Sequence, residues 1–256
     1  MKHITVKFLR KYKLFENEKL QSLKLLKKQG FCNIIYLLKT NKNKYLIRVF
    51  KHKHSSNIKR KYEYKIQNKA SKKNIAAIPY ILDKKNDLMI CEYLKGKHKN
   101  KLEKKDIKEL IKSLKILHTI KSDEKAYDLK ADFIEYKKRL QDKKSKSLAL
   151  EAIKELKKLK RYKKNLVVTH HDLNTGNILF HKNHVKFIDW EFTTINDSFF
   201  DLANICIEFK LSNKDEKILL KSYFNKIEKY HFKKLNSYKK IYINLWKLWF
   251  KDLEKR

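Results

Sequence analysis

The sequence predicts an α+β protein with a small mixed N-terminal lobe, built on an antiparallel sheet, and a larger, mostly helical C-terminal lobe. Two observations lead to this class. Between residues 31 and 93, short apolar runs alternate with polar turns, as in β-hairpins. From Lys104 onward the apolar positions recur at helical spacing, interrupted by one further hairpin at 178–188. We expect the two lobes to comprise residues 1–94 and 95–256.

The N-terminal lobe is expected to begin with a helix from Asn17 to Gln29, which Gly30 ends in the left-handed conformation. Strands at 31–38 and 44–50 follow around a polar turn, and a helix at 58–73 comes next.

Two more strands, at 80–83 and 88–93, complete this lobe and lead into the expected hinge. The C-terminal helices are expected at 104–117, 129–141, 145–163, 199–209, 213–229 and 232–254. The hairpin lies in the middle of this helical part. A cleft between the two lobes is the expected site.

The composition excludes several protein classes. With 256 residues and 42% hydrophobic content, the chain can bury a sizeable core. Residues 1–15 lack the apolar run of a signal peptide, and no window offers the roughly 18 apolar residues of a transmembrane helix. The cysteines are odd in number, lie in apolar surroundings and form no CxxC motif, which favours buried thiols in a reducing cytoplasm. They are Cys32, Cys91 and Cys206.

The net charge of +37 suggests a nucleic-acid partner at first sight. Only six of the 65 basic residues are arginine, however, although arginine reads phosphates and base edges better than lysine. The lysines are also spread over the chain instead of forming one stripe. We therefore expect no specific nucleic-acid partner and only weak, nonspecific attraction to anions.

Three polar residues surround the hairpin of residues 178–188. Asp172 and Asn177 precede it in one loop, and Asp189 follows its second strand. Folding the hairpin back brings Asp189 next to the loop, so that two carboxylates and a carboxamide converge beside apolar strands. Hard oxygen ligands of this kind suit Mg²⁺. The alternative is a hairpin with solvated polar residues at its turns, but the ordered set favours a site.

The spacing His-x-Asp-Leu-x-x-x-Asn at residues 170–177 resembles the catalytic loop of protein kinases. The segment Ile-Asp-Trp-Glu at 188–191 stands where those kinases carry Asp-Phe-Gly, with Trp in place of Phe and Glu in place of Gly. This departure resembles the small-molecule kinases, namely the choline/ethanolamine kinases and the aminoglycoside phosphotransferases.

Further motifs narrow the resemblance to the choline/ethanolamine kinases, of the bacterial choline kinase type. They are Phe-Asp-x-x-Asn at 200–204, the acid Glu208 and the paired tryptophans Trp246 and Trp249. The resemblance implies a bilobal protein-kinase-like fold and transfer of phosphate from ATP to the hydroxyl of choline or ethanolamine, with Mg²⁺ and with phosphocholine as the product from choline.

In the C-terminal lobe, the resemblance implies that Asp172 is the catalytic base. Asn177 and Asp189 would hold Mg²⁺. His170 and Asp201 would support the loop structurally, with Asp201 accepting hydrogen bonds from the loop backbone.

In the N-terminal lobe, the resemblance implies that five residues bind ATP. Arg48 is a lone cation in an apolar strand and would steady the phosphates, with Glu63 orienting it from the next helix. Asn33 lies at the mouth of the hairpin that would cover the nucleotide. Glu92 and Tyr93 belong to the hinge, where backbone groups can meet an adenine edge. The alternative for Arg48 is an outward-facing strand residue.

For the acceptor, the resemblance implies binding by Glu191, Phe192, Glu208, Trp246 and Trp249. A quaternary ammonium cannot donate hydrogen bonds, so aromatic faces and a carboxylate hold it, each aromatic contact contributing on the order of 0.5–2 kcal/mol. The alternative is core packing of the paired tryptophans. Phe192 stands where the family usually has Tyr, which keeps the aromatic face and loses a hydroxyl.

Rival functions remain open within and beyond this fold. An aminoglycoside or thiamine phosphotransferase would share the motifs, but a polycationic aminoglycoside calls for an acid-rich cleft, and the chain from Lys210 onward is strongly basic. A non-catalytic basic anion-binding protein is the distant alternative, and the intact set of Asp172, Asn177 and Asp189 argues against it.

Overall fold

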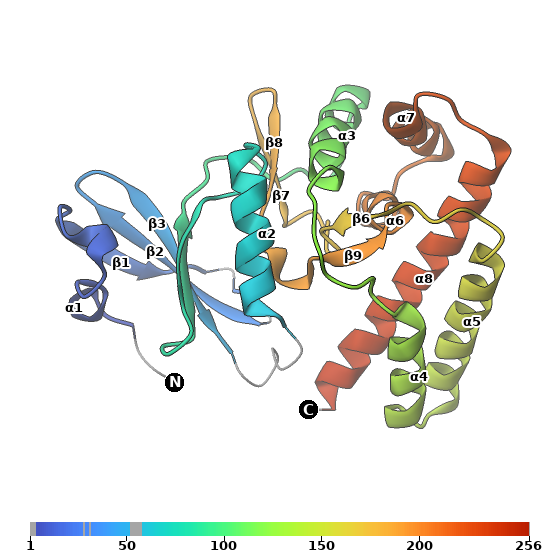
Figure 1. Cartoon of the computed structure of the whole chain (residues 1–256), viewed down its shortest axis with the longest axis horizontal. Coiled ribbons are helices and arrows are strands. Elements are labelled where there is room, and N and C mark those ends of the chain that lie inside the picture. The colour runs from blue at the N-terminus through green and yellow to red at the C-terminus, as the bar shows by residue number, and fades with distance from the viewer. Residues whose placement is uncertain (1–3, 28, 31, 52–57, 256) are drawn as a thin grey trace. The chain divides into compact units, whose positions relative to one another are not determined.

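The structure is a computed structural model of the chain that describes residues 4–27, 29–30, 32–51 and 58–255 (Figure 1). It divides into two compact units, Met1–Lys95 and Gly96–Arg256. The first contains an antiparallel sheet and the second is mostly helical, so the predicted α+β class is confirmed.

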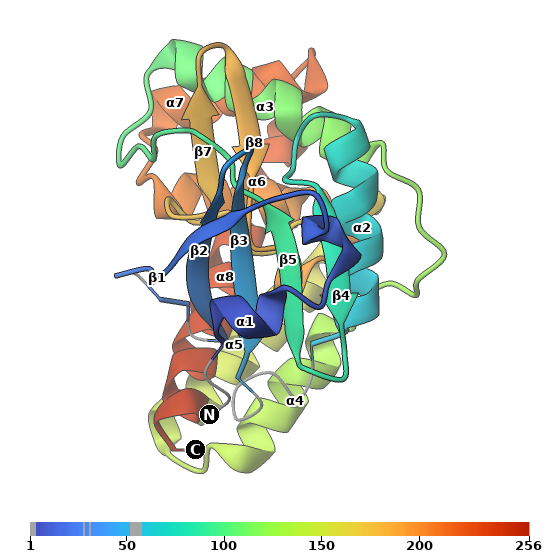
Figure 2. The same cartoon turned by 90° about the vertical axis from the view of Figure 1, so that its left-hand side faces the viewer.

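The first unit is built on a five-stranded sheet in which every neighbouring pair is antiparallel (Figure 2). In spatial order the strands are β1 (Leu20–Leu25), β2 (Asn33–Thr40), β3 (Lys44–Phe50), β5 (Leu88–Glu92) and β4 (Pro79–Asp83). The helix α2 (Arg60–Lys72) packs beside β4. Two short helical turns, α1 (Val6–Leu9) and η1 (Lys13–Phe15), precede the sheet and bury Leu9 and Phe15 in its core.

The expected helix from Asn17 to Gln29 is wrong, because this segment forms the edge strand β1. The spacing of its leucines is compatible with a helix or a strand. In the structure Leu20 is buried, whereas Leu25 is 58% exposed. A lysine-rich helix of this length is marginal in water, whereas the strand pairs with β2 from Leu20 to Leu25, with one irregularity between Leu20 and Ser22. Gly30 is not left-handed either, as the described glycines all have negative φ.

The second unit holds six longer helices among its described residues. They are α3 (Lys104–His118), α4 (Leu129–Arg139), α5 (Lys143–Leu159), α6 (Phe199–Glu208), α7 (Asn213–Phe224) and α8 (Lys229–Glu254). In this unit α8 packs against α5 and α6 (Figure 1). The helix α8 begins earlier than expected because Glu228 and His231 form a capping box there.

Two small sheets lie among these helices. The predicted hairpin is confirmed as β7 (Ile178–His181) and β8 (His184–Phe187). A second antiparallel pair, β6 (Leu166–Thr169) with β9 (Thr194–Asp197), was not predicted. The segment before the hairpin is thus paired with the segment after it, and this pairing fixes the start of the loop that carries Asp172.

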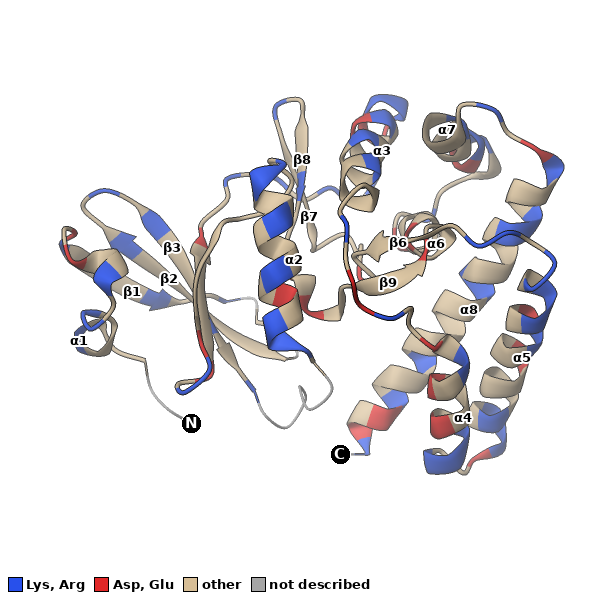
Figure 3. Ribbon diagram, viewed as in Figure 1, with Lys and Arg blue, Asp and Glu red and all other residues tan. Residues whose placement is uncertain are grey.

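Lysine and arginine are spread over the helices and strands of both units (Figure 3). No helix in the described part of the chain is long and apolar enough to cross a membrane. The three cysteines are all described and buried, as their apolar surroundings predict, and none of them is in a disulfide bond.

Candidate active site

The loop between β6 and β7 carries the first two predicted site residues. Asn177 donates two hydrogen bonds from Nδ2 to Asp172, one to the backbone oxygen at 2.9 Å and one to the carboxylate Oδ2 at 2.7 Å. Since both partners are acceptors, the amide nitrogen must face Asp172 and the oxygen Oδ1 of Asn177 points elsewhere. Asn174 donates to the other carboxylate oxygen at 2.9 Å. Amide groups therefore orient the Asp172 carboxylate from both sides.

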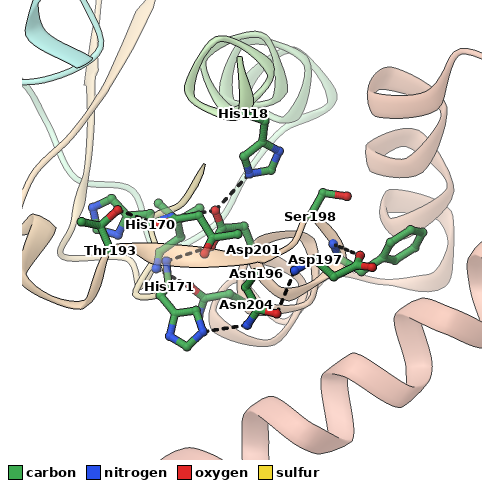
Figure 4. A network of polar contacts seen from close by, with 12 residues as sticks. His118, His170, His171, Thr193, Asn196, Asp197, Ser198, Asp201 and Asn204 are labelled. Atoms are coloured by element: carbon green, nitrogen blue, oxygen red, sulfur yellow. Dashed lines mark hydrogen bonds and ion pairs between the residues drawn. The ribbon is translucent and has the colours of Figure 1, made fainter. Parts of the chain in front are cut away.

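Asp201, in the first turn of α6, anchors the backbone of this loop (Figure 4). Its side chain is fully buried and accepts the backbone N–H groups of His170 and His171, both at 2.9 Å. The ring of His118 lies 3.1 Å from the same carboxylate. Burial alone would raise the pKa of Asp201, but the bond to His118 and the neighbouring donors lower it, so the carboxylate stays ionised. These bonds stabilise the left-handed backbone of His171, whose φ is 71°.

The two histidines of the loop have different surroundings. His171 stacks on Phe200 with ring centroids 3.8 Å apart, and its Nε2 accepts a hydrogen bond from the Asn196 amide at 2.9 Å (Figure 4). Because burial lowers the pKa of His171 to about 4, the ring is neutral at physiological pH and can accept that bond. His170 instead lies 3.0 Å through Nε2 from the backbone oxygen of Ile188, at the end of the hairpin.

Asp189 follows the hairpin in a left-handed conformation, with φ 62° and ψ 69°. The backbone N–H of Ile188 donates to the oxygen of Asn177 at 3.0 Å, which closes the hairpin onto the loop. Burial raises the pKa of Asp172 to about 7, and the charge of Asp189 is the next largest cause. The structure thus brings Asp172, Asn177 and Asp189 together.

The oxygen donors at this place fit Mg²⁺. In the part of the chain that the structure describes, no three His, Cys, Asp or Glu side chains are placed to enclose a metal by themselves. Mg²⁺ does not need such a cage, because it takes one or two protein oxygens and completes its shell with water and phosphate. Asn177 Oδ1, turned away from Asp172, and the Asp189 carboxylate are donors of this type.

Acidic side chains gather around Asp172 although the chain as a whole is basic. Besides burial and Asp189, Glu191 and Glu208 also raise the pKa of Asp172. Glu208 ends α6 and accepts a hydrogen bond from the Tyr242 hydroxyl at 2.8 Å. Tyr242 was missed from the sequence, although it precedes the paired tryptophans by one helical turn and so shares their face of α8.

Phe192, Trp246 and Trp249 form a group of half-buried rings. The Phe192 centroid lies 6.0 Å from each tryptophan, at interplanar angles of 86° and 90°. The two tryptophans are 5.0 Å apart at 76°, and Tyr242 lies 6.1 Å from Trp246. Rings that meet edge-to-face form walls instead of a stack, and such walls suit a small cation. The contacts between these rings also pack the helix α8, so packing and binding are not exclusive.

In the first unit, Arg48 points to α2 and is only 7% exposed, so the alternative of an outward-facing strand residue is wrong. Its Nη1 pairs with Oε1 of Glu63, as expected. A second guanidinium, that of Arg60, pairs with Oε2 at 2.7 Å. Burial alone would raise the pKa of Glu63, but the two guanidiniums outweigh it and lower the pKa. Arg60 was missed from the sequence, although it lies three residues before Glu63 on the same helix face.

The remaining predicted ATP residues lie in the same unit. Asn33 is fully buried, and its Oδ1 accepts a hydrogen bond from Arg60 at 3.3 Å. The backbone N–H of Glu92 donates to Ile78 at 2.8 Å, and that of Tyr93 donates to Lys44 at 3.2 Å. These two N–H groups are therefore engaged within the sheet.

Known proteins match this chain in sequence and in structure. The family model described as choline/ethanolamine kinase matches residues 24–247. Protein LicA of Haemophilus influenzae is 37% identical over 92 residues, which are 33% of this chain and 34% of that protein. The matched stretch thus spans about a third of that relative's length.

Two solved structures share the fold. Choline kinase LicA from Streptococcus pneumoniae aligns with a TM-score of 0.82 at 20% identity, over 97% of this chain and 90% of the other. A LicA structure in complex with AMP aligns with a TM-score of 0.74 at 21% identity, over 94% and 86%. These alignments confirm the predicted protein-kinase-like fold. Since the family model also matches most of the sequence, the chain belongs to the choline/ethanolamine kinase family.

Proposed function

We propose that this protein is an ATP-dependent kinase that phosphorylates the hydroxyl group of choline with the help of Mg²⁺. One observation carries the proposal: a buried aspartate, held by amide groups, is electrostatically coupled to acids that adjoin a group of perpendicular aromatic rings. A hydroxyl next to a cationic head group is the substrate that this combination suits. The choline kinase from Streptococcus pneumoniae shares the fold.

Asp172 is the proposed general base. Its carboxylate accepts hydrogen bonds from Asn174 and Asn177, which fix its direction. The pKa of about 7 suits a base that takes a proton near neutral pH. As the hydroxyl oxygen attacks the terminal phosphorus of ATP, its proton passes to Asp172. The bond between that phosphorus and the bridging oxygen breaks, and ADP leaves. Catalysis in this class comes mostly from positioning and charge neutralisation.

Asn177 and Asp189 are the proposed Mg²⁺ ligands. When bound, the ion neutralises charge on the nucleotide phosphates. Asn177 has two tasks in this scheme, because its nitrogen orients the base while its oxygen binds the metal. Glu191, which is 9% exposed and adds negative charge beside Asp172, favours cation binding at the same place.

The nucleotide is assigned to Arg48, Glu63 and Asn33 together with the hinge. Glu63 holds Arg48 in the position from which it would bind the phosphates. Since the N–H groups of Glu92 and Tyr93 are engaged in the sheet, an adenine contact here uses a carbonyl group or the N–H of Leu94. A related LicA protein binds AMP, which supports adenine nucleotide as the donor.

Choline is proposed over ethanolamine on chemical grounds. A primary ammonium carries three N–H donors that must each find an acceptor, whereas a trimethylammonium needs none. Phe192, Trp246 and Trp249 are the aromatic rings whose faces would bind the cation, and one oxygen of Glu208 is already bonded to Tyr242. The site is therefore suited to an apolar cation with a carboxylate nearby.

The decisive experiment measures ADP release with Mg-ATP and a panel of choline, ethanolamine, thiamine and an aminoglycoside. We expect the highest kcat/KM with choline. If only thiamine or only the aminoglycoside is phosphorylated, the protein is a phosphotransferase of the same fold with that substrate, and the choline proposal is wrong. Absence of turnover with all four acceptors, together with salt-dependent binding of polyanions, would instead support the non-catalytic alternative.

A further inference from the structure

A second guanidinium lies on the carboxylate that orients Arg48. Oε1 of Glu63 pairs with Nη1 of Arg48, and Oε2 pairs with Nη1 of Arg60 at 2.7 Å. The side chains of Arg48, Glu63 and Arg60 are 8%, 1% and 12% exposed, so both ion pairs lie away from bulk water. One carboxylate is thus divided between two cations, with one oxygen for each.

This division has a geometric consequence for Arg48. An isolated arginine–carboxylate pair prefers two parallel hydrogen bonds, which turn the plane of the guanidinium toward the carboxylate. Because Arg60 holds Oε2, Glu63 meets Arg48 through Oε1 and Nη1. In this pair, Glu63 therefore contacts the Arg48 guanidinium at one nitrogen of its five-donor fork.

Arg60 also contacts both strands at the open end of the β2–β3 hairpin. Its Nη2 donates to Oδ1 of Asn33 at 3.3 Å, and its guanidinium carbon lies 3.9 Å from the centroid of the Phe50 ring. Asn33 and Phe50 face each other across the two strands. A single side chain at the start of α2 therefore connects the helix to both strands and to Glu63.

We propose that Arg60 is a positioning residue for the nucleotide. It prevents Glu63 from binding Arg48 with both oxygens, and its hydrogen bond to Asn33 holds the first residue of β2. Arg48 and Asn33 are then held in place for the phosphates of ATP. This inference rests on the proposed function, because it takes ATP as the ligand.

The test compares Arg60→Met, Arg60→Lys and Lys61→Met in the full chain. Lys61 is the exposed neighbour on α2, so its variant removes the same charge without touching Glu63. Dissociation constants for Mg-ATP and for adenosine are measured by calorimetry. Arg60→Met should weaken Mg-ATP by about ten- to a hundredfold while adenosine changes by about twofold or less, since only the phosphates lose their partner. Lys61→Met should leave both constants unchanged.

Arg60→Lys separates charge from geometry. Lysine can keep a bond to Glu63 Oε2 but lacks the planar fork that reaches Asn33 as well, so Mg-ATP binding should be intermediate. If Arg60→Met does not fold, Arg60→Lys provides the test. An unchanged ratio of its dissociation constants for Mg-ATP and adenosine would overturn the inference. Steady-state kinetics should show a raised KM for ATP with an unchanged KM for choline.

A merely structural role gives a different pattern. In that case Arg60→Met lowers the melting temperature and weakens Mg-ATP and adenosine by the same factor, and the inference is overturned. Failure of the proposed function is recognised separately, because wild-type protein would then bind no Mg-ATP before any variant is compared.

Discussion

Two buried carboxylates in this protein have opposite electrostatic surroundings. Glu63 in the first unit lies between two guanidiniums, which lower its pKa. Burial, and after it the other acids around it, raise the pKa of Asp172 in the second unit to about 7. The first carboxylate is paired within the protein, whereas the second carries a charge that suits cationic ligands. Structural and reactive carboxylates can thus be told apart by the sign of their neighbours.

The largest expected effect is on catalysis, and it tests the reactive side of this comparison. Asp172→Ala should lower kcat by about 10³-fold, because it removes the general base while the aromatic rings and Arg48 remain. The measurement is ADP release at saturating choline and Mg-ATP. Glu135→Gln, at an exposed helix position, serves as the control. Nearly intact turnover of Asp172→Ala would contradict the assigned role.

The next effect concerns folding and tests the structural side. Glu63→Gln leaves two guanidiniums buried without their counter-charge, so the free energy of unfolding should fall by about 3 kcal/mol. Urea denaturation monitored by circular dichroism measures it. The matched control is Glu109→Gln, whose partner Lys112 is 69% exposed and whose ion pair should contribute little. Equal stability of the two variants would show that Glu63 is no more important for folding than an exposed ion pair.

Asp172→Asn should stabilise the ligand-free protein, whereas Glu63→Gln should destabilise it. The folded pKa of about 7 lies above the ordinary value of 3.8, so the folded state retains a proton that the unfolded chain has released. Wild-type stability from this group is therefore full below about pH 4, falls as pH rises to 7 and stays low above it. At pH 8 the variant should gain on the order of 2 kcal/mol, and the gain should vanish near pH 4. Melting curves at both pH values measure it, and a loss of stability at pH 8 would argue against crowded negative charge.

The smallest effect concerns the acceptor. Trp249→Ala should raise KM for choline about tenfold with little change in kcat, because one aromatic wall is lost. KM for ethanolamine should change less, since a primary ammonium depends on acceptors. Tyr230→Ala, an exposed aromatic on the same helix, is the control. A drop in kcat with unchanged KM for choline would indicate that Trp249 packs the helix and does not bind the acceptor.

Local sequence patterns were sufficient to predict those elements whose contacts lie between residues close in sequence. The hairpin at β7–β8 follows from two apolar runs around a turn, and folding it back places Asp189 beside Asn177. The amphipathic helices follow from their period in the same way. Helix ends deviated where a cap such as Glu228 with His231 was not recognised.

Pairing between distant segments could not be predicted. The leucines of β1 suit a helix or a strand, and only the free edge of β2 decided between them. The same holds for β6 and β9, which are four residues each and lie on either side of the hairpin. Arg60 and Tyr242 were overlooked because their roles depend on the partner to which they are bonded, Glu63 and Glu208 respectively.

The sequence by itself determined the chemistry that this protein has available: the order of Asp172, Asn177 and Asp189, the strand cation Arg48 and the paired tryptophans. Spacing carries this information, because a hairpin or a helix returns side chains to one another over a few residues. Tertiary structure alone decided how each charge is balanced. Burial raises the pKa of a carboxylate, and its charged neighbours then lower the pKa, as the guanidiniums do for Glu63, or raise it further, as the other acids do for Asp172. Both the burial and the neighbours depend on segments far apart in the chain.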